Sequence, residues 1–309
     1  MIAAKEKNEG QTLAVTVDEG CTINLSDYIK QNSSEISFTN SENWVILNPI
    51  ELSIKKKIEQ YGTKLQDWDL SINRGILTGY NDAFIIDEAT KNSLITADPK
   101  SAELIRPILR GKDIKRYSYN FANLYLICTF PSKHYNIDDY PAIKKYLLSF
   151  DKRRLAQTGE KNIDGIKGFN ARKKTGNKWF ETQDQINYSD DFYKQKLVWT
   201  PVNSEYKFTI IPENYFFNNS IFMITGDDLY YLCGILNSTL YKKYFEVNFT
   251  KGNYNYGSAS SLKKLPILKL PKEKHEIITE LVKKNLSAKN EETYLQIDKI
   301  INSFFEIVR

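Results

Sequence analysis

The sequence predicts an α+β fold, in which a twisted, mostly antiparallel sheet is flanked by helices and followed by a helical C-terminal segment. Short apolar runs separated by turn residues occupy the middle of the chain, and residues 196–200, 207–211 and 220–224 are typical of three successive strands. Apolar residues at helical spacing lie beside them, and residues 272–309 form a charged segment with the same spacing. With 309 residues, 41% of them hydrophobic, the chain can bury a substantial core.

The N-terminal part is predicted to lead into the sheet through a helix. Residues 1–43 are polar and weakly periodic, so we expect a leader or the end of a preceding domain. Residues 50–61 carry isoleucines on one face and stop at Gly62, which predicts a helix. The stretch INRGILTGYNDAFIID (72–87) follows, and its apolar end predicts a strand over 83–87.

The next region mixes short elements with one long loop. In order, we expect a short helix over 102–109, a buried strand over 123–130, a helix over 140–150 and a loop over 157–178. The loop is basic and contains four glycines. Loops of this length in a compact domain are usually functional or disordered.

The C-terminal part begins with helical spacing and ends in two helices. We expect a helix over 229–244, a Gly, Tyr and Ser loop over 253–261 and an edge strand between prolines over 265–270. Two helices, or one long broken helix, follow, with a break near 287–290. The final helices either cap the domain or pack against a partner domain. We therefore divide the chain into residues 1–43, a main domain over 44–271 and a helical packing segment over 272–309.

Charge and cysteine usage restrict the class of protein. The formal net charge is +5, and the basic residues occur in clusters. Each cluster is either ordinary solvated surface or a contact with nucleic acid. Three widely spaced cysteines indicate neither a disulfide framework nor a zinc site. No apolar run approaches the roughly 18 residues that a spanning helix needs, and the first 20 residues do not resemble a signal peptide. We expect a cytoplasmic protein without a membrane partner.

The sequence lacks the common catalytic signatures. It contains neither GxxxxGK[ST] nor GxGxxG, and only two histidines. The Asn-Pro-Pro-aromatic tetrapeptide of adenine methyltransferases is also missing. One loose pattern, Asp190 or Asp191 with Glu205 and Lys207, is compatible with a magnesium-dependent nuclease, which remains an alternative. We otherwise expect no catalytic or metal-binding residue.

Basic, amide and aromatic groups are better suited to DNA. Arginine and lysine neutralise phosphates, arginine pairs with guanine, and asparagine or glutamine pairs with adenine. The candidate DNA-binding residues are Arg74, Thr78, Asn81, Arg110, Lys112, Arg153, Arg154, Arg172, Lys173, Lys174, Asn177, Lys178, Lys207, Asn253, Tyr254 and Tyr256. Among those in the 72–87 stretch, we favour Arg74 and Thr78 for phosphate contacts, with Asn81 as a turn-capping residue.

Seven blocks, in order, resemble the C-terminal specificity domain of Taq I-type adenine methyltransferases and type IIG restriction-modification enzymes. They are ELSIKKKIEQYGTKLQDW (51–68), GILTGYNDAF (75–84), IRPILRGKDIKRY (105–117), YPAIKKYLLSF (140–150), KWFE (178–181), GILNS (234–238) and LKKLPI (262–267). The resemblance covers residues 44–309 and implies a target-recognition domain that grips duplex DNA while a separate methyltransferase domain modifies adenine.

The resulting hypothesis is sequence-specific duplex DNA recognition by a chain that is not an enzyme by itself. The resemblance implies a methyltransferase or nuclease domain or subunit as a partner, with S-adenosylmethionine and magnesium expected only on that partner. A protein-interaction module that makes no direct DNA contact is the second alternative to this hypothesis.

Overall fold

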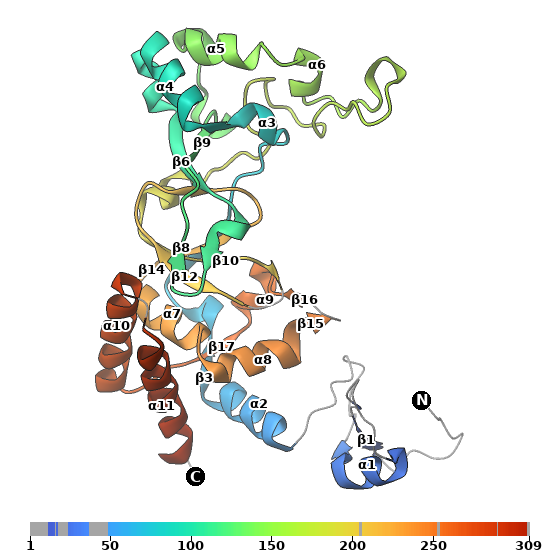
Figure 1. The fold of residues 1–309 in the computed structure, drawn as a ribbon, viewed down its shortest axis with the longest axis vertical. Coiled ribbons are helices and arrows are strands. Elements are labelled where there is room, and N and C mark those ends of the chain that lie inside the picture. The colour runs from blue at the N-terminus through green and yellow to red at the C-terminus, as the bar shows by residue number, and fades with distance from the viewer. Residues whose placement is uncertain are drawn as a thin grey trace.

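The computed structural model describes residues 12–15, 17, 24–36, 49–203, 206–251, 254–288 and 290–307. A four-stranded antiparallel sheet lies at the middle of the molecule, with helices at both ends (Figure 1). Its strands, in spatial order, are β12 (Phe208–Ile211), β10 (Lys196–Trp199), β14 (Phe222–Gly226) and β4 (Leu70–Arg74). The mixed helix and sheet architecture confirms the predicted α+β class.

The two faces of the central sheet belong to two hydrophobic cores. Successive side chains of a strand point to opposite faces. In β10, Leu197 and Trp199 join one core and Val198 joins the other, and all three are fully buried. Burial on both faces favours the apolar residues of β10, and its one charged residue, the buried Lys196, donates from Nζ to the Phe192 carbonyl at 2.6 Å.

The first core is covered by helices from both ends of the chain. They are α2 (Pro49–Tyr61), α7 (Leu229–Leu236), α8 (Thr239–Phe249), α10 (Lys272–Ser287) and α11 (Glu291–Ile307). Gly234 of α7 allows α10 to approach closely, because a Cβ there would lie 2.6 Å from the Ile278 side chain. Ile278 and Ile297 are buried in this core, so both C-terminal helices cap it.

The second core contains a smaller sheet and the helices at the opposite end of the molecule (Figure 1). The sheet consists of β13 (Phe216–Phe217), β6 (Ile105–Leu109), β9 (Leu124–Ile127) and β5 (Ile85–Asp87), and only its β13–β6 pair is parallel. The helices at this end are α3 (Asn81–Phe84), α4 (Glu88–Ala97), α5 (Pro141–Leu147) and α6 (Lys152–Leu155).

Shorter strand pairs complete the described fold. They are β3 (Gly62–Lys64) with β17 (Pro266–Leu268), β7 (Ile114–Lys115) with β8 (Ser118–Tyr119), β16 (Tyr254–Tyr256) with β11 (Val202–Asn203) and β15 (Thr250–Lys251), and β1 (Thr12–Ala14) with β2 (Ser34–Ile36). Between β1 and β2 lies α1 (Leu25–Asn32), whose N-terminus is capped by the Asn24 side chain.

The predicted helix over 102–109 was wrong. A 3-10 turn (Pro99–Glu103) precedes β6, which pairs with β9 through Pro107 and with β13 from Ile108 onward. Pro107 lies where β6 changes partners, a place where a missing backbone N–H is tolerated. In a helix the same residue would have removed a hydrogen bond.

The single helix predicted over 229–244 is two helices. The chain breaks at Asn237, whose side chain donates to the Phe208 carbonyl at 2.8 Å and accepts from the Phe208 N–H at 3.1 Å. This paired contact ties the end of α7 to the edge strand β12 and explains why the helical spacing is interrupted. Two further boundaries were wrong: α3 shortens the predicted strand over 83–87, and β16 with α9 (Ala259–Lys263) replaces most of the predicted loop over 253–261.

Candidate nucleic-acid interface

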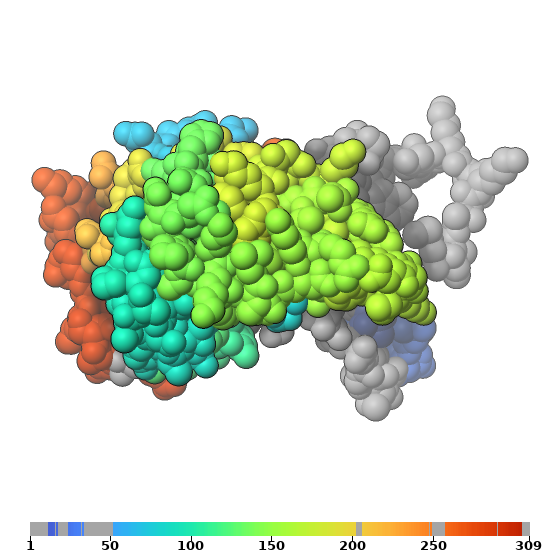
Figure 2. Space-filling view, turned by 90° about the horizontal axis from the view of Figure 1, so that it is seen from above, coloured from blue at the N-terminus to red at the C-terminus, as the bar shows by residue number. Residues whose placement is uncertain are grey.

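Residues 152–178, here called the basic segment, concentrate the positive charge of the protein. They contain nine lysines and arginines against two acidic residues, a formal charge of +7, whereas the whole chain carries +5. The remainder of the chain is therefore slightly acidic. The segment begins with α6 and extends outward from the molecule beyond it (Figure 1), and the green and yellow-green residues around it form most of the surface seen from above (Figure 2).

The basic segment is a long loop whose two ends are joined by backbone hydrogen bonds, as in a hairpin. Gly159 N–H donates to the Arg172 carbonyl at 2.9 Å, and Ala171 N–H donates to the Glu160 carbonyl at 3.0 Å. Nearer the tip, Ile163 is buried and its N–H donates to the Phe169 carbonyl at 2.8 Å. Left-handed backbone at four tip positions makes the reversal possible: Asn162, Asp164, Gly165 and Gly168.

Arg172 anchors the base of the segment and is not at the surface. Its side chain is buried and donates to four backbone carbonyls: Nε to Leu155 at 2.8 Å, Nη1 to Thr78 at 2.8 Å and Glu181 at 2.6 Å, and Nη2 to Trp179 at 2.7 Å. Burial lowers the pKa of Arg172 to about 10. We assign it a structural role, because a guanidinium enclosed in this way does not reach a phosphate.

The Thr-Gly turn of the 72–87 stretch, Thr78–Gly79, packs against the Arg172 side chain. Thr78 is fully buried, and its hydroxyl donates to the Asn81 side chain at 2.7 Å. Gly79 has a φ of +76°, and a Cβ on it would lie 2.8 Å from Cδ of Arg172. Thr78 therefore shapes the turn on which Arg172 packs, and Asn81 is exposed beside it with its oxygen engaged.

Two adjacent arginines of α6 have opposite surroundings. Arg153 is paired with two carboxylates, Asp151 and Asp164, which raise its pKa. Arg154 instead lies over the Tyr80 ring at 4.3 Å and the Phe169 ring at 5.5 Å, and no carboxylate pairs with it among the described residues. Stacking on aromatic rings orients a guanidinium without neutralising it.

The remaining predicted residues of the basic segment are of two kinds, exposed cations without an ion-pair partner and one amide engaged in hydrogen bonds. Lys173, Lys174 and Lys178 are exposed and have no ion-pair partner in the part of the chain that the structure describes. Asn177 is half-buried, and its amide nitrogen donates to the carbonyls of Thr182 at 3.3 Å and Gln183 at 2.9 Å. It therefore organises the chain that follows the segment.

The sequence reasoning missed cations that belong to the same surface. Lys152, Lys161 and Lys167 are exposed and, within the described ranges, free of carboxylate partners. For Lys161 and Lys167, their position inside the predicted loop over 157–178 was the available signal, and for Lys152 it was the adjacent pair Arg153 and Arg154. Seven cations of the basic segment thus have no carboxylate partner among the residues that the structure describes: Lys152, Arg154, Lys161, Lys167, Lys173, Lys174 and Lys178.

The predicted residues outside the segment lie elsewhere. Arg74 faces Asp184 at 3.6 Å, and Arg110 forms a two-pronged pair with Asp113, with both distances 2.9 Å. Lys112 is exposed next to Arg110, and Lys207 is half-buried just before β12. Asn253 and the side chains of Tyr254 and Tyr256 lie outside the described residues, whereas the backbone of both tyrosines belongs to β16.

The nuclease alternative gains no support from the surroundings of Asp191. That carboxylate accepts from the Asn73 amide at 2.7 Å and pairs with Lys194 at 2.8 Å. Glu205 lies outside the described residues. Within the described ranges, no group of three His, Cys, Asp or Glu side chains is arranged to hold a metal ion.

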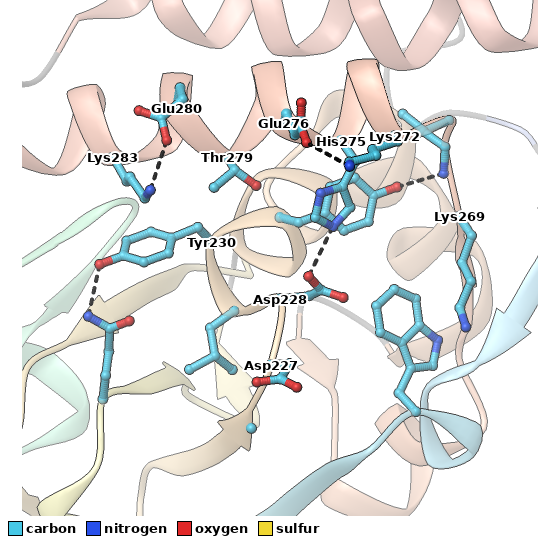
Figure 3. A pocket seen from close by; sticks show the side chains of 16 residues that line it. Asp227, Asp228, Tyr230, Lys269, Lys272, His275, Glu276, Thr279, Glu280 and Lys283 are labelled. Atoms are coloured by element: carbon cyan, nitrogen blue, oxygen red, sulfur yellow. Dashed lines mark hydrogen bonds and ion pairs between the residues drawn. The ribbon is translucent and has the colours of Figure 1, made fainter.

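A pocket of about 870 Å³ lies between α7 and α10 (Figure 3). Its charged groups largely satisfy one another: His275 lies 3.2 Å from Asp228, and Lys283 lies 2.8 Å from Glu280. His275 also stacks on Tyr231, with the ring centroids 4.1 Å apart. The contacts of His275 with Asp228 and Tyr231 fasten α10 to the start of α7, whereas the Lys283–Glu280 pair lies within α10.

The chain is a mixed helix and sheet domain that carries an anchored basic segment. Residues 106–267 match the model of the TaqI-like C-terminal specificity domain, and the chain belongs to this family, the specificity domain of restriction-modification enzymes. The match begins in β6 and ends in β17, so it includes the whole basic segment.

Among the relatives is the Type II methyltransferase M.MjaIV of Methanocaldococcus jannaschii, 26% identical over 187 residues that cover 56% of this chain and 56% of that protein. The Type IIL restriction-modification enzyme MmeI, solved in complex with DNA, matches 97% of this chain with 39% of its own, at a TM-score of 0.53 and 12% identity. The type IIG restriction endonuclease BpuSI matches 82% of this chain with 32% of its own, at a TM-score of 0.46 and 12% identity. The chain thus spans little more than half of its curated relative. None of the described helices is both long and apolar enough to cross a membrane.

Proposed function

We propose that this chain recognises a specific sequence in duplex DNA, as the specificity part of a restriction-modification adenine methyltransferase. The observation that carries the proposal is the basic segment: a formal charge of +7 on 27 residues, anchored by a buried arginine and extending outward beyond α6. Ordered, unpaired cations release counterions when they meet phosphates, which gives salt-dependent affinity. Membership in the specificity-domain family supports the same function.

The proposal divides the work between groups of residues. Arg154, Lys173, Lys174 and Lys178, with the three further lysines of the segment, contact phosphates and fix the position of the domain on the duplex. Arg172 and Thr78 hold the segment in shape without contacting DNA. Phosphate contacts carry no sequence information, so base readers are needed as well.

Catalysis belongs to a partner in this proposal. S-adenosylmethionine and magnesium bind the methyltransferase or nuclease domain, which is either fused to this chain or separate. A cytoplasmic location, where chromosomal and invading DNA are accessible, follows from the proposed role.

Binding of the whole chain to random-sequence duplexes, measured by gel shift over a range of salt concentrations, tests the proposal. We expect affinity that falls steeply with salt, and a further loss when Lys173→Glu and Lys174→Glu are combined. If neither the chain alone nor the chain with its methyltransferase partner binds any duplex in a salt-sensitive way, the proposal is wrong. If the Lys173→Glu, Lys174→Glu variant binds DNA more weakly but still binds the methyltransferase partner, the basic segment contacts DNA and the protein-interaction alternative is excluded.

A further inference from the structure

An exposed glutamine beside the basic segment is held in a fixed orientation by other amides. The Gln185 side chain is exposed, and its nitrogen donates to the Asn177 oxygen at 2.7 Å. Asn177 is in turn fixed by two backbone carbonyls, those of Thr182 and Gln183. An exposed glutamine normally samples several rotamers, so this support reduces the entropy that a ligand contact must otherwise overcome.

The hydrogen bonds determine which way both amides face. Backbone carbonyls only accept, so the Asn177 nitrogen must face them and its oxygen must point toward Gln185. The group of Gln185 that meets this oxygen is therefore its nitrogen. The Gln185 oxygen and its second N–H remain for a ligand. Their orientation follows from the hydrogen bonds of Asn177 and Gln185, which assign the oxygen and nitrogen of both amides.

The backbone around Gln185 is fixed as well. Ser132 N–H donates to the Gln185 carbonyl at 3.3 Å, and Ser132 Oγ donates to the Ile186 carbonyl at 3.0 Å. Ile186 has a φ of +54° and is buried in the second core. A β-branched residue in this conformation is rare, and such strain persists only where the surroundings enforce it, often at ligand contacts.

Gln185 is joined through Asn177 to the end of the basic segment. Asn177, its support, precedes Lys178, an unpaired cation of the basic segment. On the other side, Asp184 lies next to Gln185 and faces Arg74. A phosphate bound by the segment would thus bring the edge of a groove toward the oriented amide.

We infer that Gln185 reads an adenine in the major groove, accepting from N6–H and donating to N7, with Asn177 as its positioning residue. This inference rests on the proposed DNA recognition and names a specificity-determining residue within it. A glutamine amide presents the acceptor and donor that the major-groove edge of adenine complements. The other bases do not offer this pair.

The experiment compares binding selections from a randomised duplex library for the wild-type chain, Gln185→Ala and the control Asn187→Ala, together with the catalytic partner if binding requires it. Asn187 is an exposed amide two residues away for which no hydrogen bond is found among the described residues. Since Gln185 is exposed, its truncation leaves the fold intact, which a thermal melt verifies.

We expect Gln185→Ala to lose the preference for adenine at one position, by roughly 5- to 150-fold, while its salt dependence and other positions stay unchanged. Asn187→Ala should retain the wild-type consensus. Placing 7-deazaadenine at the affected position should then weaken the wild type but not Gln185→Ala, because the two changes remove the same contact.

An unchanged consensus for Gln185→Ala would overturn the inference and leave the proposed function standing. Relaxation at a position without adenine, or equal effects of both substitutions, would also overturn it. A wild-type chain that binds DNA without selecting any consensus, or does not bind at all, would instead count against the proposed function.

Discussion

Replacing Arg154 by glutamine should remove one phosphate contact without disturbing the fold. Arg154 is held over Tyr80 and Phe169 and has no carboxylate partner among the described residues, so it is the arginine of α6 that is available to an anion. Glutamine retains a polar side chain of similar reach but no charge. The change therefore isolates the electrostatic part of the contact.

The expected magnitude follows from counterion release. Each neutralised phosphate contributes about 0.9 to the slope of log affinity against log salt, so seven unpaired cations set an upper limit of roughly 6 for the wild-type slope. Losing one contact lowers the slope by about 0.9. Extrapolated from 1 M salt, where the term vanishes, this weakens binding about 5-fold at 0.15 M and about 15-fold at 0.05 M.

The assay is a fluorescence-anisotropy titration of one duplex at several salt concentrations. Lys272→Gln is the matched control, because it changes the net charge equally but lies on α10, with 90% of its side chain exposed. Arg154→Lys keeps the charge but loses the planar stacking, so its slope should stay near that of the wild type. If Arg154→Gln and Lys272→Gln shift the slope equally, the assignment of the phosphate contact to this surface is refuted.

Three further substitutions test other parts of the same structure. Asp164→Asn should tighten duplex binding several-fold in the same titration, because it removes one of the two carboxylates that pair with Arg153. Asparagine tolerates the left-handed backbone at this position, so the fold is retained. Unchanged or weaker binding would contradict the pairing of Asp164 with Arg153. Arg172→Met should lower the free energy of unfolding by about 3 kcal/mol or more in a urea titration, since four backbone carbonyls lose their donor; a near-neutral effect would return Arg172 to the list of DNA contacts. Burial lowers the pKa of Lys196 to about 7, below the unfolded value near 10.5, so the unfolded chain binds the extra proton between these values and stability should rise with pH from 7 to 9. In the wild type the free energy of unfolding should rise by about 1 kcal/mol per pH unit over this range, and Lys196→Met should lack that rise. Parallel pH profiles of the two proteins would refute the lowered pKa of Lys196.

The central elements of the fold could be predicted from the sequence because their patterns are local. Short apolar runs between turns predicted β10, β12 and β14, a continuous apolar run predicted β9, and helical spacing predicted α2, α5 and the C-terminal helices. Predictions were wrong where a long-range contact overrides the local pattern. The clearest case is Asn237, which ends α7 because its side chain pairs with the backbone of Phe208 on another strand.

For the candidate interface, the sequence by itself determined where positive charge is concentrated and which polar groups are present. Only the tertiary structure decided which of these groups are available. Arg172 and Arg154 have the same chemistry, but Arg172 is saturated by the carbonyl of Thr78, 94 positions away, and by three others. Arg153 is neutralised in part by Asp164, whereas its neighbour Arg154 rests on aromatic rings. The physical reason is that burial and ion pairing depend on neighbours brought together by folding, whereas composition and periodicity are written along the chain.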